Sequence, residues 1–123
     1  MKRGFAEPVC NEGLDYLLET WQRTVNEISD GYRALFDEFL NDMDGRQIIS
    51  ELMPLAPEEE RTRMLEPLAS LDRSFLKGTR AVNVCIWGEN QAAQHGYDPQ
   101  QNWWYYRVPD NLDSVEDKDA WPR

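Results

Sequence analysis

Residues 11–44, NEGLDYLLETWQRTVNEISDGYRALFDEFLNDMD, carry the pattern that decides the fold. Their apolar side chains recur at alternating steps of four and three, a spacing that places them on one face of a helix. These side chains are Leu14, Leu18, Trp21, Val25, Ile28, Tyr32, Leu35 and Phe39. The segment therefore predicts one long amphipathic helix over 11–44. Gly31 predicts a kink within it, because glycine costs about 1 kcal/mol relative to alanine inside a helix.

Two more helices are predicted after this segment. A short one over 46–53 presents apolar side chains before Pro54 interrupts it. Another, over 57–77, begins with Pro57 and three glutamates, residue types that suit the first turn of a helix. Since two apolar stripes are buried when they pack together, we expect this last helix to lie along the first one as a helical hairpin.

The texture of the chain changes to a strand pattern at residue 79. Residues 79–87 alternate β-branched and other side chains, and residues 102–109, NWWYYRVP, form the natural partner strand. The fold class is thus α+β: a helical hairpin plus a C-terminal two-stranded antiparallel β-hairpin. We expect a single compact domain over 1–109, followed by an acidic tail over 110–123 from which Trp121 packs back onto the domain.

Alternation along 102–109 divides its side chains between two faces. We expect Trp104, Tyr106 and Val108 to face the helices. The opposite face then carries Trp103, Tyr105 and Arg107, and it continues to Trp87 on the other strand. Aromatic rings and arginine dominate the binding energy of protein interfaces, which favours a docking surface. The alternative is that these rings fill a thin core and that Arg107 pairs locally.

Charge limits the classes of partner. The chain has 23 acidic against 13 basic side chains and a net charge of -10. Such an excess repels nucleic acids and anionic membranes, so we expect a basic protein as the partner and no direct binding to nucleic acid or membrane. Glu19, Asp30 and Asp37 recur along 11–44 at steps of eleven and seven, which keeps them on one helix face. Either they steer a basic partner or they form the solvated side of the helix.

Catalytic and metal-binding signals are weak. The one histidine, His95, lies in a loop with no nucleophile motif beside it, and the two cysteines, Cys10 and Cys85, are 75 positions apart. We therefore expect no catalytic residue, cofactor or metal, and a reducing, cytoplasmic location. No secretory signal or membrane span is expected.

The predicted function is that of a small acidic, non-catalytic protein-binding module. Its most specific form is an inhibitor or immunity-type protein that occludes a basic partner. The partner-binding residues would be Trp87, Trp103, Tyr105, Arg107, Glu19, Asp30 and Asp37. Two alternatives stay open: a homodimeric structural or adaptor protein that associates through the long helix, and a small enzyme that uses His95.

Overall fold

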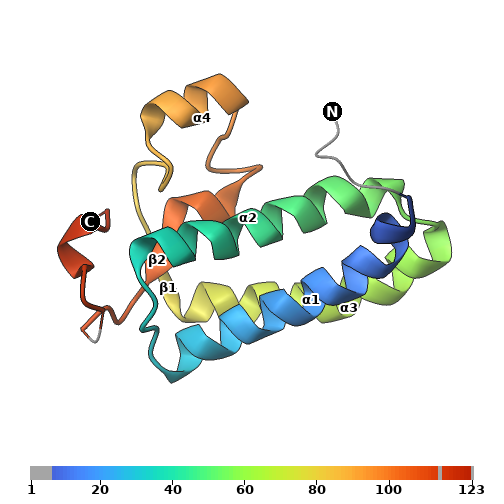
Figure 1. The fold of residues 1–123 in the computed structure, drawn as a ribbon, viewed down its shortest axis with the longest axis horizontal. Coiled ribbons are helices and arrows are strands. Elements are labelled where there is room, and N and C mark those ends of the chain that lie inside the picture. Colours follow the sequence, from blue (N-terminus) through green and yellow to red (C-terminus); the bar gives the residue numbers. More distant parts are fainter. Residues whose placement is uncertain (1–6, 114, 123) are drawn as a thin grey trace.

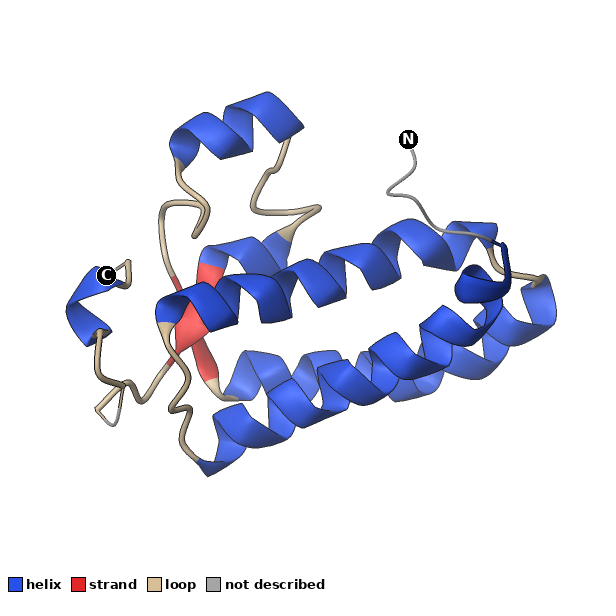
Figure 2. Ribbon diagram, viewed as in Figure 1, coloured by secondary structure: helices blue, strands red, loops and turns tan. Residues whose placement is uncertain are grey.

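The structure, a computed structural model, describes residues 7–113 and 115–122, with side chains from residue 13 onward. The helices are α1 (Glu7–Asp30), α2 (Phe36–Leu52), α3 (Glu58–Lys77) and α4 (Glu89–His95); the strands are β1 (Thr79–Ala81) and β2 (Arg107–Pro109); and short 3-10 helices cover Met53–Leu55, Trp103–Tyr106 and Lys118–Ala120. The predicted α+β class is confirmed (Figure 2).

The three long helices form the body of the molecule. As Figure 1 shows, α2 runs antiparallel to both α1 and α3, and the two-stranded sheet lies at the end where α1 and α3 finish. Helix α4 projects on the far side of α2 from α1 and α3. Because α1 and α3 both run opposite to α2, they are parallel to each other, and the predicted hairpin of two helices is replaced by three long helices of alternating direction.

The prediction of a single helix over 11–44 is wrong, because the first helix ends at Asp30. Gly31 has φ of 105°, a left-handed conformation that a helix cannot contain and that glycine adopts without strain. Helix α2 begins five residues later, where the backbone N–H of Leu35 donates to Oε1 of Glu38 at 3.0 Å. The apolar stripe survives the break, since Tyr32 and Phe39 are both buried.

The predicted boundary between a helix over 11–44 and a separate helix over 46–53 is also wrong. Helix α2 continues through Gly45 as far as Leu52. A Cβ at position 45 would meet nothing within 4 Å, so no close approach requires glycine there. Glycine inside a helix costs about 1 kcal/mol of stability through its low helix propensity. The packing of Phe39, Met43 and Ile49 in the core outweighs this cost at Gly45.

The core lies between the long helices, and the third predicted helix agrees with α3. Helix α1 buries Leu14, Trp21, Val25 and Ile28, whereas α3 contributes Met64, Leu68 and Phe75. Pro67 lies inside α3, which nevertheless runs unbroken from Glu58 to Lys77. Because the stripe of α1 is already covered within the monomer, the residues expected to form a dimer seam serve the core instead.

An ion pair between the buried Arg46 and the half-buried Asp72 joins α2 to α3. Nε and Nη2 of Arg46 donate to the two carboxylate oxygens of Asp72 at 3.0 and 2.8 Å. From α1, Nε1 of Trp21 donates to the same carboxylate at 3.0 Å. The guanidinium carbon lies 4.5 Å from the ring centroid of Trp104 and 5.5 Å from that of Trp103. All three long helices thus meet at Asp72.

The strands are much shorter than predicted. β1 and β2 pair antiparallel over three residues each, with Arg80 opposite Val108. After Val82 the chain bends, so Val84 is exposed while Cys85 is buried, the reverse of the predicted alternation. The N–H of Ile86 still finds an acceptor, the carbonyl of Tyr105 at 2.8 Å. The predicted strand over 79–87 is therefore a strand only at its start.

Residues 103–106 form a 3-10 helix, not a strand. A 3-10 helix turns every three residues, so the two-residue alternation that assigned the faces does not apply. Trp104 and Tyr105 both point inward, and each is buried. The expectation that Tyr105 faces outward is wrong. Val108 is buried as predicted, whereas Tyr106 and Trp103 are half-buried.

The segment after residue 109 packs against the helices. Trp121 and Val115 are buried, and the Trp121 ring contacts Phe36 and Phe39 with centroids 5.0 Å away. Asp117 accepts a hydrogen bond from the N–H of Phe36, at the start of α2, and this bond holds the pKa of the Asp117 carboxyl below its ordinary value. The prediction that Trp121 packs back is confirmed.

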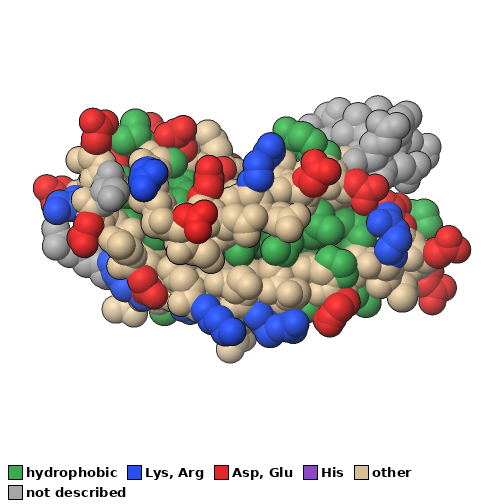
Figure 3. Space-filling model, turned by 90° about the horizontal axis from the view of Figure 1, so that it is seen from below, with side chains coloured by type: hydrophobic (Ala, Val, Ile, Leu, Met, Phe, Trp, Pro, Cys, Tyr) green, Lys and Arg blue, Asp and Glu red, His purple; other side chains and the backbone are tan. Residues whose placement is uncertain are grey.

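Some apolar side chains reach the surface. Tyr16, Leu55 and Leu65 are each more than half exposed. Figure 3, which views the molecule from below, shows apolar side chains among acidic and basic ones. Such exposure is ordinary for a small protein, because there is not enough polar surface to cover it. In the described part of the chain, no helix is long and apolar enough to cross a membrane.

Candidate partner-binding site

The predicted aromatic docking row does not form a continuous surface. Tyr105 is fully buried, and Trp103 packs on Phe75 with ring centroids 5.8 Å apart. Arg107 is held by its own chain: Nε donates to the Thr79 hydroxyl and Nη2 to the Thr79 carbonyl, both at 2.8 Å. Of the four predicted residues, Trp87 has the most accessible ring, with 36% of its surface exposed.

Trp87 and Tyr105 converge on one carboxylate, that of Asp44 in α2. The Tyr105 hydroxyl donates to Oδ1 at 2.6 Å, and Nε1 of Trp87 donates to the same oxygen at 3.1 Å. Burial, and then the bond to Asp44, raise the pKa of Tyr105 well above its ordinary value. Tyr105 therefore stays protonated at neutral pH. Its hydroxyl holds the Asp44 carboxylate in place through this hydrogen bond.

A cavity of about 210 Å³ opens beside this carboxylate. Its lining comes from three places in the chain: Asp44 of α2, Trp87 from the turn before α4, and the group Gln91, His95 and Tyr97 on α4 or just after it. The ring of Tyr97 stacks on His95 at 5.3 Å and contacts Tyr105 at 4.6 Å. We call this cavity the Asp44 pocket.

Local sequence explains how α4 reaches the Asp44 pocket. Gly88 and Gly96, at its two ends, have φ of 97° and 74°, which lets the chain turn into and out of a helix of seven residues. Gln91 and His95 are four apart and so share a face. Nε2 of His95 donates to Oε1 of Gln91 at 3.1 Å.

The loop after α4 is anchored to α2. Asn102 Nδ2 donates to Oε1 of Gln47 at 2.9 Å, and the Tyr106 hydroxyl donates to the carbonyl of Tyr97. Asp98 accepts the backbone N–H groups of Gln100 and Gln101. These hydrogen bonds hold the long connection over residues 88–102 to α2 and to the segment that follows it.

The predicted acidic row is divided by the break at Gly31. Glu19 and Asp30 lie on α1, whereas Asp37 lies in the first turn of α2. All three side chains are exposed, and among the described residues none of them makes a hydrogen bond or an ion pair. They remain available to a partner, although no longer as one row on a single rod.

A second acidic group lies between α1 and α2. The Tyr32 hydroxyl donates to Oδ2 of Asp42 at 2.7 Å, and the carboxylates of Glu27 and Glu38 are close enough to act on both groups. Burial, opposed by the Tyr32 bond and assisted by Glu27 and Glu38, raises the pKa of Asp42 above its ordinary value. Acidic side chains are therefore concentrated between α1 and α2.

Among the described residues, His95 and Cys85 bear on catalysis and metal binding. His95 is exposed and contacts Gln91 and Tyr97, while Asp98 serves the loop backbone. Within the described part of the chain, no group of three or more His, Cys, Asp or Glu side chains could hold a metal ion. Cys85 is a buried free thiol whose pKa is raised by that burial. The Cys10 side chain lies outside the described residues.

Sequence patterns missed Asp44 and Tyr97 as site residues. Asp44 is the last residue of the predicted helix over 11–44, and Tyr97 lies two positions after His95 in the predicted loop. Their association depends on contacts 43 and 61 positions apart in the chain, from Asp44 to Trp87 and to Tyr105. The available signal was the density of aromatic residues downstream, which needs hydrogen-bond acceptors for its indole and hydroxyl groups.

Comparison with known proteins adds no assignment: no family model, curated protein or solved structure matches this chain. A functional conclusion for this chain therefore rests on the geometry of its described residues.

Proposed function

We propose that this chain is a small, acidic, non-catalytic binding protein of the cytoplasm that occludes a basic protein partner, as an inhibitor or immunity-type protein does. The observation that carries the proposal is the set of exposed carboxylates without partners on α1 and α2: Glu19, Asp30 and Asp37. With the net charge of -10, they speed the approach of a basic surface and disfavour nucleic acid.

Charge alone does not hold a complex together. Exposed ion pairs each contribute about 0–1 kcal/mol, and salt screens them. Aromatic surface has to supply the remainder, and Trp87 is the predicted anchor that stays accessible. The buried Tyr105 contributes indirectly, because it holds the carboxylate to which Trp87 is bonded. A buried free thiol at Cys85 agrees with a reducing compartment.

The test is capture of a partner by the immobilised protein from extracts of its own cells, at low and at high salt. A basic protein should be retained at low salt and released at about 0.5 M salt, where screening shortens the range of charge interactions to a few ångströms. The triple variant Glu19→Gln, Asp30→Asn, Asp37→Asn should retain at least about fivefold less of it.

The matched control removes equal charge from elsewhere on the surface. Glu66→Gln, Asp113→Asn and Glu116→Gln are exposed positions on α3 and in the C-terminal segment. Capture should stay within about twofold of the parent protein, because salt screens charges that lie far from the docking surface more than those within it. Equal losses in the two triple variants, or a partner that is acidic, would contradict the proposal. Light scattering on the isolated protein tests the homodimer, for which a doubled mass is the diagnostic result.

A further inference from the structure

Asp44 presents one carboxylate oxygen to which no group of the described residues donates a hydrogen bond. Its Oδ1 already accepts from Tyr105 and Trp87, at 2.6 and 3.1 Å. Among the described residues, no group donates to Oδ2. Asp44 is only half-buried and lines an open cavity, so this oxygen can meet a ligand from solvent.

The other walls of the Asp44 pocket are aromatic. Trp87 and Tyr97 line it, and His95 stacks on Tyr97 with the two rings inclined by 22°. Faces of tryptophan and tyrosine attract cations by about 0.5–2 kcal/mol, more as water is excluded. Aromatic side chains beside one carboxylate form an environment that favours positive charge.

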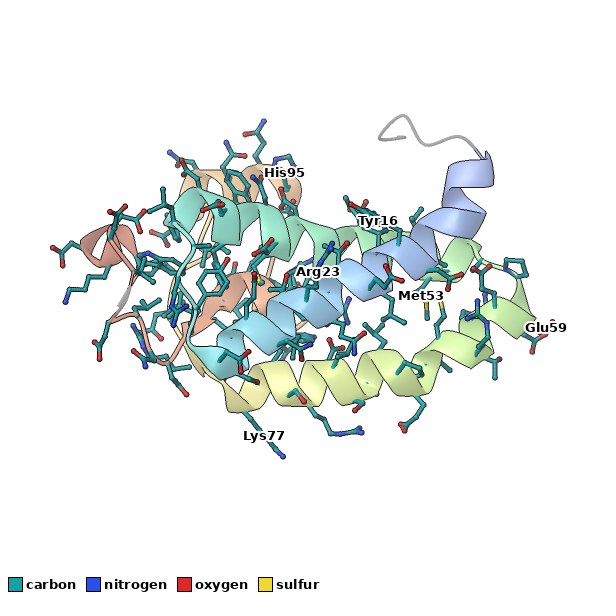
Figure 4. The ribbon with its side chains drawn as sticks, turned by 60° about the horizontal axis from the view of Figure 1, so that its bottom comes forward. Tyr16, Arg23, Met53, Glu59, Lys77 and His95 are labelled. Carbon is teal, nitrogen blue, oxygen red and sulfur yellow. The ribbon has the colours of Figure 1, made fainter. Side chains whose placement is uncertain are left out.

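The size of the pocket limits its occupant. Cavities that bind drug-sized ligands measure about 300–1,000 Å³. The Asp44 pocket, at about 210 Å³, is smaller and has room for a single side chain. This volume suits one side chain inserted by a macromolecular partner better than a drug-sized ligand. In Figure 4, His95 of this pocket lies at the opposite edge of the molecule from Lys77.

We propose that the Asp44 pocket receives a lysine side chain from the basic partner. The ammonium group donates to Oδ2 of Asp44, and the methylene stem packs on Trp87 and Tyr97. Lysine is favoured over arginine because a guanidinium binds carboxylates best through both oxygens, and Oδ1 is already taken. This inference rests on the proposed function only for the source of the lysine.

Other cavities are poorer hosts for a cation. The cavity beside Glu27 and Asp30 is also lined by Arg33, which would repel an incoming ammonium. Another, near Trp121, is lined by Arg80 and Lys118. In the Asp44 pocket the aspartate is the one charged lining residue when His95 is neutral.

The test is a nuclear magnetic resonance titration that needs no partner. The ¹⁵N-labelled protein is titrated with Nα-acetyl-lysine N-methylamide, and the indole N–H signal of Trp87 is followed. That signal is assigned by its disappearance in Trp87→Phe. Lysine should shift the signal in a saturable way, whereas the norleucine derivative, which has the same stem without the charge, should bind at least about tenfold more weakly. The arginine derivative should bind more weakly than lysine.

Two variants locate the charge that is recognised. In Asp44→Asn an amide oxygen still accepts from Tyr105 and Trp87, but the anion is lost, so lysine binding should fall by about tenfold. Glu66→Gln removes one charge from an exposed site on α3 and should change the affinity by less than about twofold. If Asp44→Asn does not fold, the lysine and norleucine comparison on the parent protein still decides.

The possible results separate the pocket from the proposed function. Norleucine binding as strong as lysine, an undiminished affinity in Asp44→Asn, or no shift of the Trp87 signal would overturn the lysine pocket, even if a basic partner is captured. Arginine binding more tightly than lysine would overturn the choice of lysine. A lysine site with no basic partner in the capture experiment would leave the pocket standing and remove the proposed function.

Discussion

Asp44 and Arg46 lie two positions apart on α2, yet their surroundings differ in almost every respect. Arg46 is buried, forms a two-point ion pair with Asp72 and lies against the rings of Trp103 and Trp104. Asp44 is half-buried, accepts two neutral donors and faces an open cavity. The same aromatic segment supplies both regions, covering one charge fully and the other partly.

The difference arises from whether a charge is neutralised within the chain. A buried ion needs a partner, because desolvation costs several kcal/mol per ion. Arg46 has that partner in Asp72, although its Nη1, like Nε1 of Trp104, is buried without an acceptor among the described residues. Among the described residues Asp44 has no cationic partner, and its unused oxygen lies beside an open cavity. The first arrangement holds helices together, and the second leaves charge for a ligand.

The largest loss in the free energy of unfolding should come from removing Asp72, the ion-pair partner of Arg46. Asp72→Ala leaves Arg46 buried and uncompensated, and the free energy of unfolding in urea should fall by about 3–5 kcal/mol. Glu66→Ala, on the same helix, removes an exposed pair to Arg73 and should cost less than about 1 kcal/mol. Arg46→Met combined with Asp72→Asn should lose less than Asp72→Ala, since no unpaired charge remains. A loss of about 1 kcal/mol or less in Asp72→Ala would show that the cluster is not closed.

A smaller effect should come from the support of the open region. Tyr105→Phe removes the hydroxyl that donates to Asp44 and should lower the free energy of unfolding by about 1–2 kcal/mol. The loss stays below that of Asp72→Ala because water can replace the hydroxyl at a half-buried carboxylate. Tyr106→Phe, which removes a bond to a backbone carbonyl, is the control and should cost about 0.5–1 kcal/mol. Urea titrations of the two variants give the comparison.

The smallest change in the free energy of unfolding should come from substitution of Asp42. Its pKa is raised in the folded protein, so its favourable contribution is full below the unfolded value of 3.8 and is lost as pH rises through the folded value. Asp42→Asn keeps an acceptor for Tyr32, and at pH 7 it should raise the free energy of unfolding by about 0.5–1 kcal/mol. This gain should vanish below about pH 4, and a gain that is independent of pH would contradict the assigned cause.

Periodicity predicted the elements whose stability depends on one apolar face. The stripe on α1 and the helix over 57–77 can be read directly from spacing, and both are present. Spacing could not locate the break at Gly31, because the apolar register continues on both sides of it. The helix ends there because Gly31 adopts a φ of 105°. The spacing of apolar residues does not predict this backbone angle.

The site was less predictable than the fold. Tyr105 was assigned to the wrong face because a strand over residues 102–109 would point successive side chains to opposite faces, whereas WWYY forms a 3-10 helix that packs beside α2. The Arg46–Asp72 pair and the Asp44 pocket join positions 26 to 61 residues apart. Such pairings depend on how the helices are arranged, which local patterns do not specify.

The bond from Asp117 to the start of α2 has a kinetic consequence. It joins positions 81 residues apart, so a loop covering most of the chain must close before this helix start gains its carboxylate. Contacts of such long range slow folding more than local helical ones do. The packing of Trp121 against Phe36 and Phe39 belongs to the same closure, and its fluorescence would report a late folding event rather than helix formation.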